Sequence, residues 1–484
     1  MASVETLKRV SDFVWELPIS FKQGMRVPGR IYATQKIVQA LDQGVFNQLA
    51  NVASLPGVES HVCAMPDAHW GYGFPIGGVA AMRLDDGVVS PGGIGFDINC
   101  GMRLIKTNLT ASEVKPHIEK LVNGLYSRVP VGVGTKGLLR LSEEDFRRLL
   151  IKGARWCVSE GYGRKDDLER TEAGGCYPDA DPEAVSERAI ERGLRQVGTL
   201  GSGNHYLEIQ TLKKEHLFNE DVAERLGLFP NQVVVMYHCG SRGFGHQVAS
   251  DYLEQFLSVM GPRYKIKVPD RELSCAPINS PHAQAYLAAM RCAINMAFAN
   301  RQMIQHQVRE VFEFVFGRSS YDLGMDQIYD ISHNTAKVEE QVVKGVRKKL
   351  LVHRKGATRS YGPGFDELPP DLKDVGQPVI IGGSMETGSY LLVGLSSSSE
   401  AFHTTAHGAG RAMSRTKAKK MFHGRTLQDK MINRGIYIRA ASLSGLAEEA
   451  GGAYKDVDDV VAAAEKSGLS RRVARFVPIG NIKG

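Results

Sequence analysis

An acidic residue and a thiol lie three positions apart in the glycine-rich stretch SPGGIGFDINCG, residues 90–101. Asp97 offers a carboxylate, which suits hard cations, and Cys100 offers a thiol, which suits soft ones. The pair therefore fits a divalent transition ion such as Mn²⁺, Zn²⁺ or Fe²⁺ better than Ca²⁺. A buried free cysteine beside a turn aspartate explains this segment equally well, because free cysteine is often a small core residue. Other parts of the chain must decide between the two interpretations.

Three histidines stand beside short apolar or glycine-rich segments. His205 follows the glycine-rich turn of GTLGSGNHYLE, His238 ends the apolar run VVVMYH, and His333 ends QIYDISH. We expect each to leave a strand at a turn, and imidazoles at rigid strand ends can converge on one ion. Together with the aspartate and the cysteine they make five potential ligands. Each histidine taken singly is more often a hydrogen-bonded loop or core residue, but their shared placement favours a metal site. Five ligands exceed the needs of one open tetrahedral site and a thiolate can bridge, which is consistent with two ions sharing Cys100.

A histidine, a Gly-Ala-Gly turn and a basic run occupy residues 407–420, HGAGRAMSRTKAKK. Glycines let backbone amides approach an anion, and the N-terminus of a basic helix stabilises phosphate. His407 can act there as a general acid or as a phosphoramidate-forming nucleophile. A turn followed by a solvated basic helix explains the same residues. The helix is expected to carry Arg411, Arg415, Lys417, Lys419 and Lys420.

A second basic cluster lies in LLVHRKGATR, residues 350–359, and continues a basic run at 344–349. Clusters of this kind are usually solvated surface. The alternative prediction is a groove that follows the backbone of a nucleic acid. Its members are His353, Arg354, Lys355 and Arg359, with Lys344, Arg347, Lys348 and Lys349.

Short apolar strands alternating with helices must position these side chains. We expect strands at 233–237, 327–331, 350–352 and 379–381 and a long helix at 281–316. Residues 164–182 are charged and rich in turn formers, which predicts a surface insertion. The sequence contains no internal repeat and no clear linker. It therefore predicts an α+β fold, one large mixed catalytic domain over residues 1–484 with β-sheets flanked by helices.

Composition restricts the class of protein. The 484 residues are 43% hydrophobic and 8% aromatic, which allows a substantial core and excludes a disordered chain. Seven cysteines without a framework, and no signal-like start, predict a reducing, cytoplasmic location. No apolar run approaches the roughly 20 residues that span a bilayer, so no membrane association is expected. The net charge of +7 favours polyanionic partners.

Long strings of this sequence, in order and over nearly the whole chain, resemble the RtcB family of tRNA-splicing ligases. Members of this family are GTP-dependent and manganese-dependent RNA ligases. The strings that carry the resemblance are PDAHWGYGFPIG, SPGGIGFDINCG, GTLGSGNHYLEIQ, HCGSRGFGHQV, ISHN, LLVHRKGATR, PVIIGGSMETGSYLLVG, HGAGRAMSR and NIKG. The resemblance implies an RtcB-type catalytic domain.

The resemblance also implies roles for individual residues. It makes His407 the nucleophile that attacks the α-phosphate of GTP and becomes a histidine guanylate, with Asp67 orienting the imidazole. The implied ligands of two Mn²⁺ ions, with Cys100 bridging, are Asp97, Cys100, His205, His238 and His333. The implied guanylate contacts are Asn204, Glu208, Ser384, Ser389, Gly408, Ala409, Gly410, Tyr454 and Lys483. Glu386 stands where the family commonly has glycine, and its carboxylate would repel phosphate unless it pointed away.

The implied reaction joins RNA ends in tRNA splicing and RNA repair. A 2′,3′-cyclic phosphate is opened to a 3′-phosphate, GMP is transferred to it to give RNA(3′)pp(5′)G, and a 5′-hydroxyl displaces GMP. The implied partners are RNA, as tRNA exon halves or broken RNAs, together with GTP and the activator archease. Two rival functions are a dinuclear metallophosphoesterase, which needs no His407 loop, and an RNA-binding scaffold, which needs no metal ligands.

Overall fold

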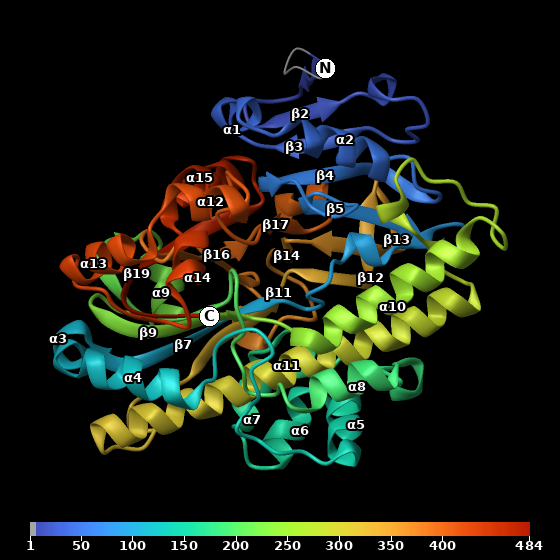
Figure 1. Cartoon of the computed structure of the whole chain (residues 1–484). Coiled ribbons are helices and arrows are strands. Elements are labelled where there is room, and N and C mark those ends of the chain that lie inside the picture. Colours follow the sequence, from blue (N-terminus) through green and yellow to red (C-terminus); the bar gives the residue numbers. More distant parts are fainter. Residues whose placement is uncertain (1–5) are drawn as a thin grey trace.

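A computed structural model describes residues 6–484, so the first five residues of the predicted domain 1–484 lie outside the described part. Figure 1 shows β-sheets in the upper and central parts of the molecule, with the long helices α10 and α11 running below them. The C-terminal helices α12–α15 gather at the left. The predicted mixed α+β fold is confirmed. Within residues 6–484, no helix is long and apolar enough to cross a membrane.

The first sheet carries the N-terminal strands and one later hairpin. Its strands pair antiparallel except β3 and β4, which are parallel. In spatial order they are β1 (Lys8–Arg9), β2 (Val14–Leu17), β3 (Gly29–Tyr32), β4 (Val58–His69), β5 (Ile76–Arg83), β13 (Val346–Lys355) and β12 (Asn334–Val343).

The second sheet is larger and mostly antiparallel, with β18 joining β19 in parallel. In spatial order its strands are β11 (Gln327–Ser332), β7 (Gly101–Thr110), β9 (Gln232–Cys239), β8 (Tyr206–Leu217), β19 (Ser470–Lys483), β16 (Ser389–Gly394) and β15 (Pro378–Ile381), with β18 (Tyr437–Ala440) beside β19. Two short pairs complete the β-structure: β6 (Val88–Val89) with β10 (Ala276–Pro277), and β14 (Ala357–Arg359) with β17 (Thr404–Ala406).

Helices cover both sheets. They are α1 (Gln35–Gln39), α2 (Gln43–Val52), α3 (Ala111–Val114), α4 (Ile118–Arg128), α5 (Glu143–Lys152), α6 (Ala154–Ser159), α7 (Lys165–Glu169), α8 (Glu187–Leu194), α9 (Glu220–Arg225), α10 (Arg242–Met260), α11 (Pro281–Phe316), α12 (Arg415–Met421), α13 (Gly424–Asn433), α14 (Leu443–Glu448) and α15 (Val457–Lys466).

The long helix α11 has the bounds that the sequence predicts. Ser280 caps its N-terminus by accepting a hydrogen bond from the backbone N–H of Ala283, and Pro281 occupies the first turn. Gly317 ends it in a left-handed conformation at φ 64°. Because α11 is buried along most of its length, it forms a rigid base on which the second sheet and the α5–α8 region pack.

The predicted strands are confirmed as β9, β11, β13 and β15, and one is longer than expected. The prediction for β13 covered only residues 350–352, whereas the strand begins at Val346. Its first residues are charged and form a hairpin with β12 that projects beyond the core. Lys344 and Gly345 make the turn with φ values of 51° and 78°, the left-handed pair that suits a tight hairpin.

Residues 164–182, predicted as a surface insertion, contain two buried carboxylates. Asp167 forms a two-pronged ion pair with Arg309 of α11, both distances being 2.7 Å. Glu172 pairs with the Nζ of Lys337 at 2.8 Å and accepts a hydrogen bond from the Ser332 hydroxyl at 2.6 Å. The segment is therefore tied to α11 and to the strands β11 and β12, while its status as an insertion stays a prediction.

Candidate active site

The five predicted metal ligands lie together where four adjacent strands of the second sheet begin or end. Strands β11, β7, β9 and β8 are neighbours and run antiparallel, so the ends of β11 and β9 lie beside the starts of β7 and β8. Cys100 precedes β7, His205 precedes β8, His238 is near the end of β9, and His333 follows β11. The expectation that all three histidines leave strands is wrong for His205, which enters one. Antiparallel order brings it to the same place nevertheless.

The ligand atoms form two overlapping groups around the Cys100 thiol. Its Sγ lies 3.3 Å from Nε2 of His205 and 3.1 Å from Nε2 of His238. Nε2 of His205 is 2.8 Å from Oδ2 of Asp97, and Nε2 of His238 is 3.0 Å from Nε2 of His333. Cys100 with His238 and His333 forms one group, and Cys100 with Asp97 and His205 forms the other; ligand atoms lie within 4.8 Å of one another in each.

Hydrogen bonds at the far side of two imidazoles leave lone pairs facing the thiol. Nδ1 of His205 lies 2.9 Å from the carbonyl oxygen of Leu200, and Nδ1 of His238 lies 3.0 Å from that of Asn204. A carbonyl oxygen only accepts, so both Nδ1 atoms donate, and in a neutral ring Nε2 then carries the lone pair. Lone pairs that converge without a proton between them fit a cation.

Burial keeps the protons off two of the imidazoles, those of His238 and His333. It lowers the pKa of His238 and of His333 well below the ordinary range, and neighbouring histidines lower both further. Burial raises the pKa of the Cys100 thiol, as does Asp97. Oδ1 of Asp97 is buried without a hydrogen-bond partner. These residues fit a divalent metal ion, which would displace the thiol proton and satisfy the carboxylate.

Two features behind the cluster fix its shape. The buried Arg301 of α11 donates hydrogen bonds to the carbonyl oxygens of Asn99 at 2.7 Å and Cys239 at 2.9 Å, next to two ligands. Its guanidinium is itself held by both carboxylate oxygens of Asp330, at 2.8 and 2.9 Å. At Gly240, a Cβ would lie 2.3 Å from Oδ1 of Asp97, so only glycine leaves room for this carboxylate.

His407 stands beside the metal cluster with its orientation set by Asp67. The ring centroids of His407 and His333 are 4.7 Å apart. Oδ2 of the fully buried Asp67 lies 2.6 Å from Nδ1 of His407 and accepts the backbone N–H groups of His407 and Gly408 at 3.0 and 3.2 Å. Burial alone would raise the pKa of Asp67, but His407 outweighs it and the net shift is downward. An ionised Asp67 accepts a hydrogen bond from Nδ1–H of His407, which in a neutral ring leaves Nε2 with a free lone pair.

Lys455 and Gly410 hold the end of strand β4 that carries Asp67. Lys455 donates from its Nζ to the carbonyl oxygen of Ala68 at 2.5 Å and lies 3.4 Å from that of Pro66, on both sides of Asp67. Gly410 adopts φ 71°, and a Cβ there would lie 2.1 Å from the Asp67 carbonyl oxygen. The close approach of these two chain segments therefore depends on this glycine.

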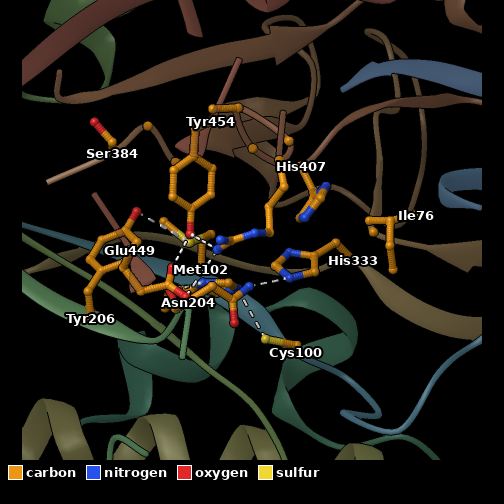
Figure 2. Close-up of a pocket in the computed structure, with 18 of the residues that line it drawn as sticks. Ile76, Cys100, Met102, Asn204, Tyr206, His333, Ser384, His407, Glu449 and Tyr454 are labelled. Atoms are coloured by element: carbon orange, nitrogen blue, oxygen red, sulfur yellow. Dashed lines mark hydrogen bonds and ion pairs between the residues drawn. The ribbon is translucent and has the colours of Figure 1, made fainter. Parts of the chain in front are cut away.

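A cavity, which we call the first cavity, opens onto His407 and the metal cluster. Figure 2 shows His407 and His333 together on one side of it, Tyr454 and Glu449 on the other, and Cys100 at its base. Of the predicted site residues, its lining includes Asp97, Cys100, His238, His333, His407, Gly408, Ala409, Gly410, Asn204, Glu208, Ser384, Tyr454 and Lys483. Ser389, Asp67 and His205 are not in the lining.

Ser389 lies behind the first cavity. Its hydroxyl is 3.4 Å from Nε2 of Gln210 and accepts the N–H of Gly383 at 3.3 Å, so it supports the wall rather than forming it. Glu208 lies in that wall. Burial raises the pKa of Glu208 to about 7, although amide donors from Gln210, at 2.5 Å, and Asn481 favour the ionised form.

Glu449 is a buried carboxylate among the donors of the first cavity. It accepts the Tyr454 hydroxyl and lies 3.2 Å from a guanidinium nitrogen of Arg411 and 3.8 Å from Nζ of Lys483. One carboxylate thus holds three donors that face the cavity. Burial lowers the pKa of Lys483, and Glu449 opposes that effect.

Glu386 points away from the first cavity. Its Oε1 lies 2.7 Å from Nζ of Lys430 in α13, and its Oε2 accepts the N–H of Gly451 at 2.9 Å. Arg434 adds a third contact at 3.6 Å. Both carboxylate oxygens are bound by these neighbouring groups. The repulsion between Glu386 and phosphate that the sequence analysis considered therefore does not arise.

A second cavity adjoins the metal cluster from the other side. It shares Asp97, Asn204 and Arg415 with the first cavity and reaches His205. Its basic lining residues are Lys136, Arg192, Arg195, Arg242, His246 and Arg415. The ring of His246 stacks on that of Phe96 with centroids 4.8 Å apart. The two cavities therefore meet at the metal ligands.

Two predictions about basic segments need correction. His353, Arg354, Lys355 and Arg359 are at most 5% exposed, so they do not line a nucleic-acid groove. Arg354, for example, forms a two-pronged pair with Glu339 at 2.6 and 2.8 Å. The run at 344–349 lies on the projecting hairpin. In residues 407–420, helix α12 starts only at Arg415 with Ser414 as its cap, so Arg411 precedes the helix instead of lying on it. The Gly-Ala-Gly turn is therefore part of a loop and not a helix N-terminus.

Comparison with known proteins shows the family of this chain. A family model described as tRNA-splicing ligase RtcB matches residues 48–484. The chain belongs to the RtcB family. It is 51% identical to the tRNA-splicing ligase RtcB of Archaeoglobus fulgidus over 479 residues, 99% of each chain. Identity to the Thermococcus kodakarensis protein of that name is 50% over 486 residues, covering both chains fully. The RNA-splicing ligase RtcB of Mycobacterium tuberculosis is 48% identical over 440 residues, 90% of this chain and 100% of that one.

Several residues of this RtcB-family site were not singled out from the sequence. Arg301 lies within the long helix α11, away from any turn, whereas Glu449, Arg242 and Lys455 lie in glycine-containing segments from which only a neighbouring histidine or tyrosine was singled out. Two of them left a local signal, since Arg242 follows His238 in HCGSRGFG and Lys455 adjoins Tyr454. Their roles depend on contacts between distant segments, which the fold creates.

Proposed function

We propose that this RtcB-family protein is a GTP-dependent RNA ligase that joins a 3′-phosphate or 2′,3′-cyclic phosphate end to a 5′-hydroxyl end. The observation that carries the proposal is the Asp67–His407 pair, set beside a cluster of metal ligands and opening into the same cavity. A phosphoesterase would not need an imidazole held in this way. A scaffold would need neither feature.

The metal requirement follows from the ligand set. We propose two Mn²⁺ ions, because Cys100 belongs to both ligand groups and a thiolate can bridge. Asp97 and His205 would complete one coordination shell, and His238 and His333 the other. When bound, these ions would neutralise negative charge on the phosphates that enter the cavity.

The first chemical step belongs to His407. Its Nε2 attacks the α-phosphorus of GTP, a phosphorus–nitrogen bond forms, and pyrophosphate leaves with the electron pair of the broken bond. Asp67 accepts the hydrogen bond from Nδ1–H, so the proton of the neutral ring is on Nδ1 and the attacking nitrogen, Nε2, needs no prior deprotonation. Arg411 lines the cavity and can stabilise charge on the phosphates. The product is a histidine guanylate.

The following steps transfer and release GMP. An oxygen of the RNA 3′-phosphate attacks the phosphorus on His407, which regains its lone pair, and RNA(3′)pp(5′)G forms. The 5′-hydroxyl of the second RNA then attacks the 3′-phosphorus, loses its proton and expels GMP. A cyclic phosphate must first be hydrolysed to a 3′-phosphate. The basic second cavity suits the strand with the 5′-hydroxyl, because it meets the first cavity at Asn204 and Arg415.

A ligation assay tests this function. Two RNA oligonucleotides, one ending in a 3′-phosphate and one beginning with a 5′-hydroxyl, are incubated with the protein, Mn²⁺ and GTP. We expect a joined product that requires GTP and carries a 3′,5′-phosphodiester. Release of inorganic phosphate without joining would favour a phosphoesterase, and binding without any reaction would favour a scaffold. The same assay with tRNA exon halves, with and without archease, tests the proposed role in splicing.

Changing Asp67 to Asn is expected to slow formation of the histidine guanylate by about 10²–10⁴-fold, because a neutral amide no longer fixes the Nδ1–H tautomer. Bound metal should not change, since Asp67 belongs to neither ligand group. Rapid-quench measurement of label transfer from GTP, with metal analysis of the same sample, checks both points. Asp374→Asn, on an exposed aspartate, is the control. A folded Asp67→Asn protein with a wild-type rate would contradict the role.

Binding of the guanine base is expected to depend on pH through Glu208. If its carboxylate accepts N–H groups of guanine, as we propose, the protonated form must lose its proton on binding. With a pKa of about 7, affinity for GMP should rise roughly tenfold per pH unit up to pH 7 and then level off. Calorimetric titration with GMP in metal-free buffer checks this, because it avoids the pH dependence of metal binding. Glu208→Gln should remove the slope, and an unchanged slope in that variant would refute the assignment.

A further inference from the structure

The positive charge of this protein is concentrated in one segment. Residues 411–439 contain nine lysines and arginines and a single acidic residue, Asp429, so their net charge exceeds the +7 of the whole chain. This segment forms α12, α13 and β18, and with α14 it makes a cap of residues 411–454. Residues of the cap form a small hydrophobic core that packs on Met385, which lies outside the cap: Leu427, Met431, Ile436, Ile438, Leu446 and Ala450. In Figure 1 the cap lies at the left edge of the molecule.

Two faces of α12 use their charges differently. Arg415 and Lys419, four residues apart, share one face, and both pair with Glu448, at 3.1 and 2.7 Å. Lys417 and Lys420, three residues apart, share the opposite face. Both are exposed, and within residues 6–484 neither has an ion-pair partner. Arg415 and Lys419 therefore join α12 to α14 within the cap, whereas Lys417 and Lys420 form no ion pair among the described residues.

Helix α13 continues this pattern. Lys430 and, more distantly, Arg434 contact Glu386 beneath the cap, at 2.7 and 3.6 Å. Arg425 is 75% exposed and has only a loose pair with Asp429 at 3.8 Å. We call the outward surface that carries Lys417, Lys420 and Arg425 the cap face.

Helix α12, which carries Lys417 and Lys420 of the cap face, begins where the two cavities meet. Arg415, the first residue of α12, lines both cavities, and the chain just before it contributes Arg411 to the first cavity alone. The second cavity has basic residues of its own from other segments. An RNA whose 3′-phosphate reaches His407 thus leaves the first cavity beside the cap, while the other strand has a separate basic path.

Resting on the proposed ligase function, we propose that the cap face binds the phosphodiester backbone of the RNA strand whose 3′-phosphate enters the first cavity. Residues three apart on a helix are about 5–6 Å apart at Cβ, so Lys417 and Lys420 can follow one backbone. Such contacts read charge and not sequence. They would help to hold the strand during both transfer steps.

Binding of a 20-nucleotide RNA with a 3′-phosphate and a 5′-phosphate tests this surface, because that RNA cannot serve as the 5′-hydroxyl strand. Anisotropy titrations over a range of salt compare the wild type with Lys417→Ala/Lys420→Ala. Loss of two phosphate contacts should weaken binding by about tenfold and reduce the slope of log K against log salt by about 1.4. The matched control is Lys152→Ala/Lys165→Ala, two exposed lysines on α5 and α7, which Figure 1 places far from the cap.

Two further measurements separate this inference from the proposed function. Guanylylation of His407 by GTP alone, and GMP transfer to a dinucleotide 3′-phosphate too short to reach the cap face, should be unchanged in the cap variant. If the wild type takes up no GMP, the ligase proposal fails. If it does, and the cap variant binds the 20-mer like the control, the cap-face inference fails. Equal weakening for an RNA with a 5′-hydroxyl and a 3′-hydroxyl would overturn the assignment to the 3′-phosphate strand.

Discussion

Cys100→Ala is expected to lower the bound Mn²⁺ below two ions per chain and to abolish ligation. The Sγ atom lies 3.3 and 3.1 Å from two imidazole nitrogens and belongs to both ligand groups, so its removal affects both proposed ions. Mutation of a residue that only hydrogen-bonds to a metal ligand lowers metal affinity by roughly 10–100-fold, and removal of a ligand itself should lower it further. Metal analysis after gel filtration, together with the ligation assay, measures both effects.

The control for Cys100→Ala is Cys157→Ala. Cys157 is also a buried free cysteine, but it packs in the hydrophobic core, with its Sγ 3.6 Å from the Ala299 carbonyl oxygen, and belongs to neither ligand group, so its loss should change neither metal content nor activity. The bridging role is refuted if the Cys100→Ala protein keeps two ions per chain and ligates RNA at the wild-type rate.

His407→Ala is expected to reduce ligation with GTP by at least about 10⁴-fold, because the attacking nitrogen is removed. Metal content should be retained, since His407 is in neither ligand group. The loss should be confined to steps that use the histidine guanylate. When RNA(3′)pp(5′)G is supplied ready-made, the variant should still join it to a 5′-hydroxyl end.

The bypass reaction distinguishes a nucleophile from a structural residue. A variant that fails with both GTP and the preactivated RNA would indicate that His407 supports the site as a whole. A variant that ligates normally with GTP would exclude His407 as the carrier of GMP. The rate of joining, followed on denaturing gels, decides between these outcomes.

The sequence predicted correctly that the five candidate metal ligands lie close together, because each residue type indicates its chemistry and lies beside a turn. Asp97 and Cys100 are three residues apart, and the histidines border apolar strands that are easy to recognise. The prediction that His205 leaves a strand was wrong, because a glycine-rich turn marks a strand boundary without showing whether the strand precedes or follows it. Antiparallel pairing made the error harmless.

Residues that act across long sequence distances could not be predicted. Arg354 and Lys355 look like surface charges in the sequence, but the fold buries them against Glu339 and against the carbonyl oxygens of Tyr72 and Gly92. Glu449 has no local motif, and its importance arises because Tyr454, Arg411 and Lys483 meet there. Pairing partners of buried charges depend on topology, which local patterns do not contain.

Labelling with GTP that carries ³²P at the α-phosphate tests the central claim most directly. The wild-type protein is incubated with Mn²⁺ and this GTP without RNA, denatured and digested, and the labelled peptide is identified. We predict label that is acid-labile and base-stable, as a phosphoramidate is, on the peptide that contains His407. Absence of label on a folded, metal-loaded protein, or label on another residue, would contradict the account.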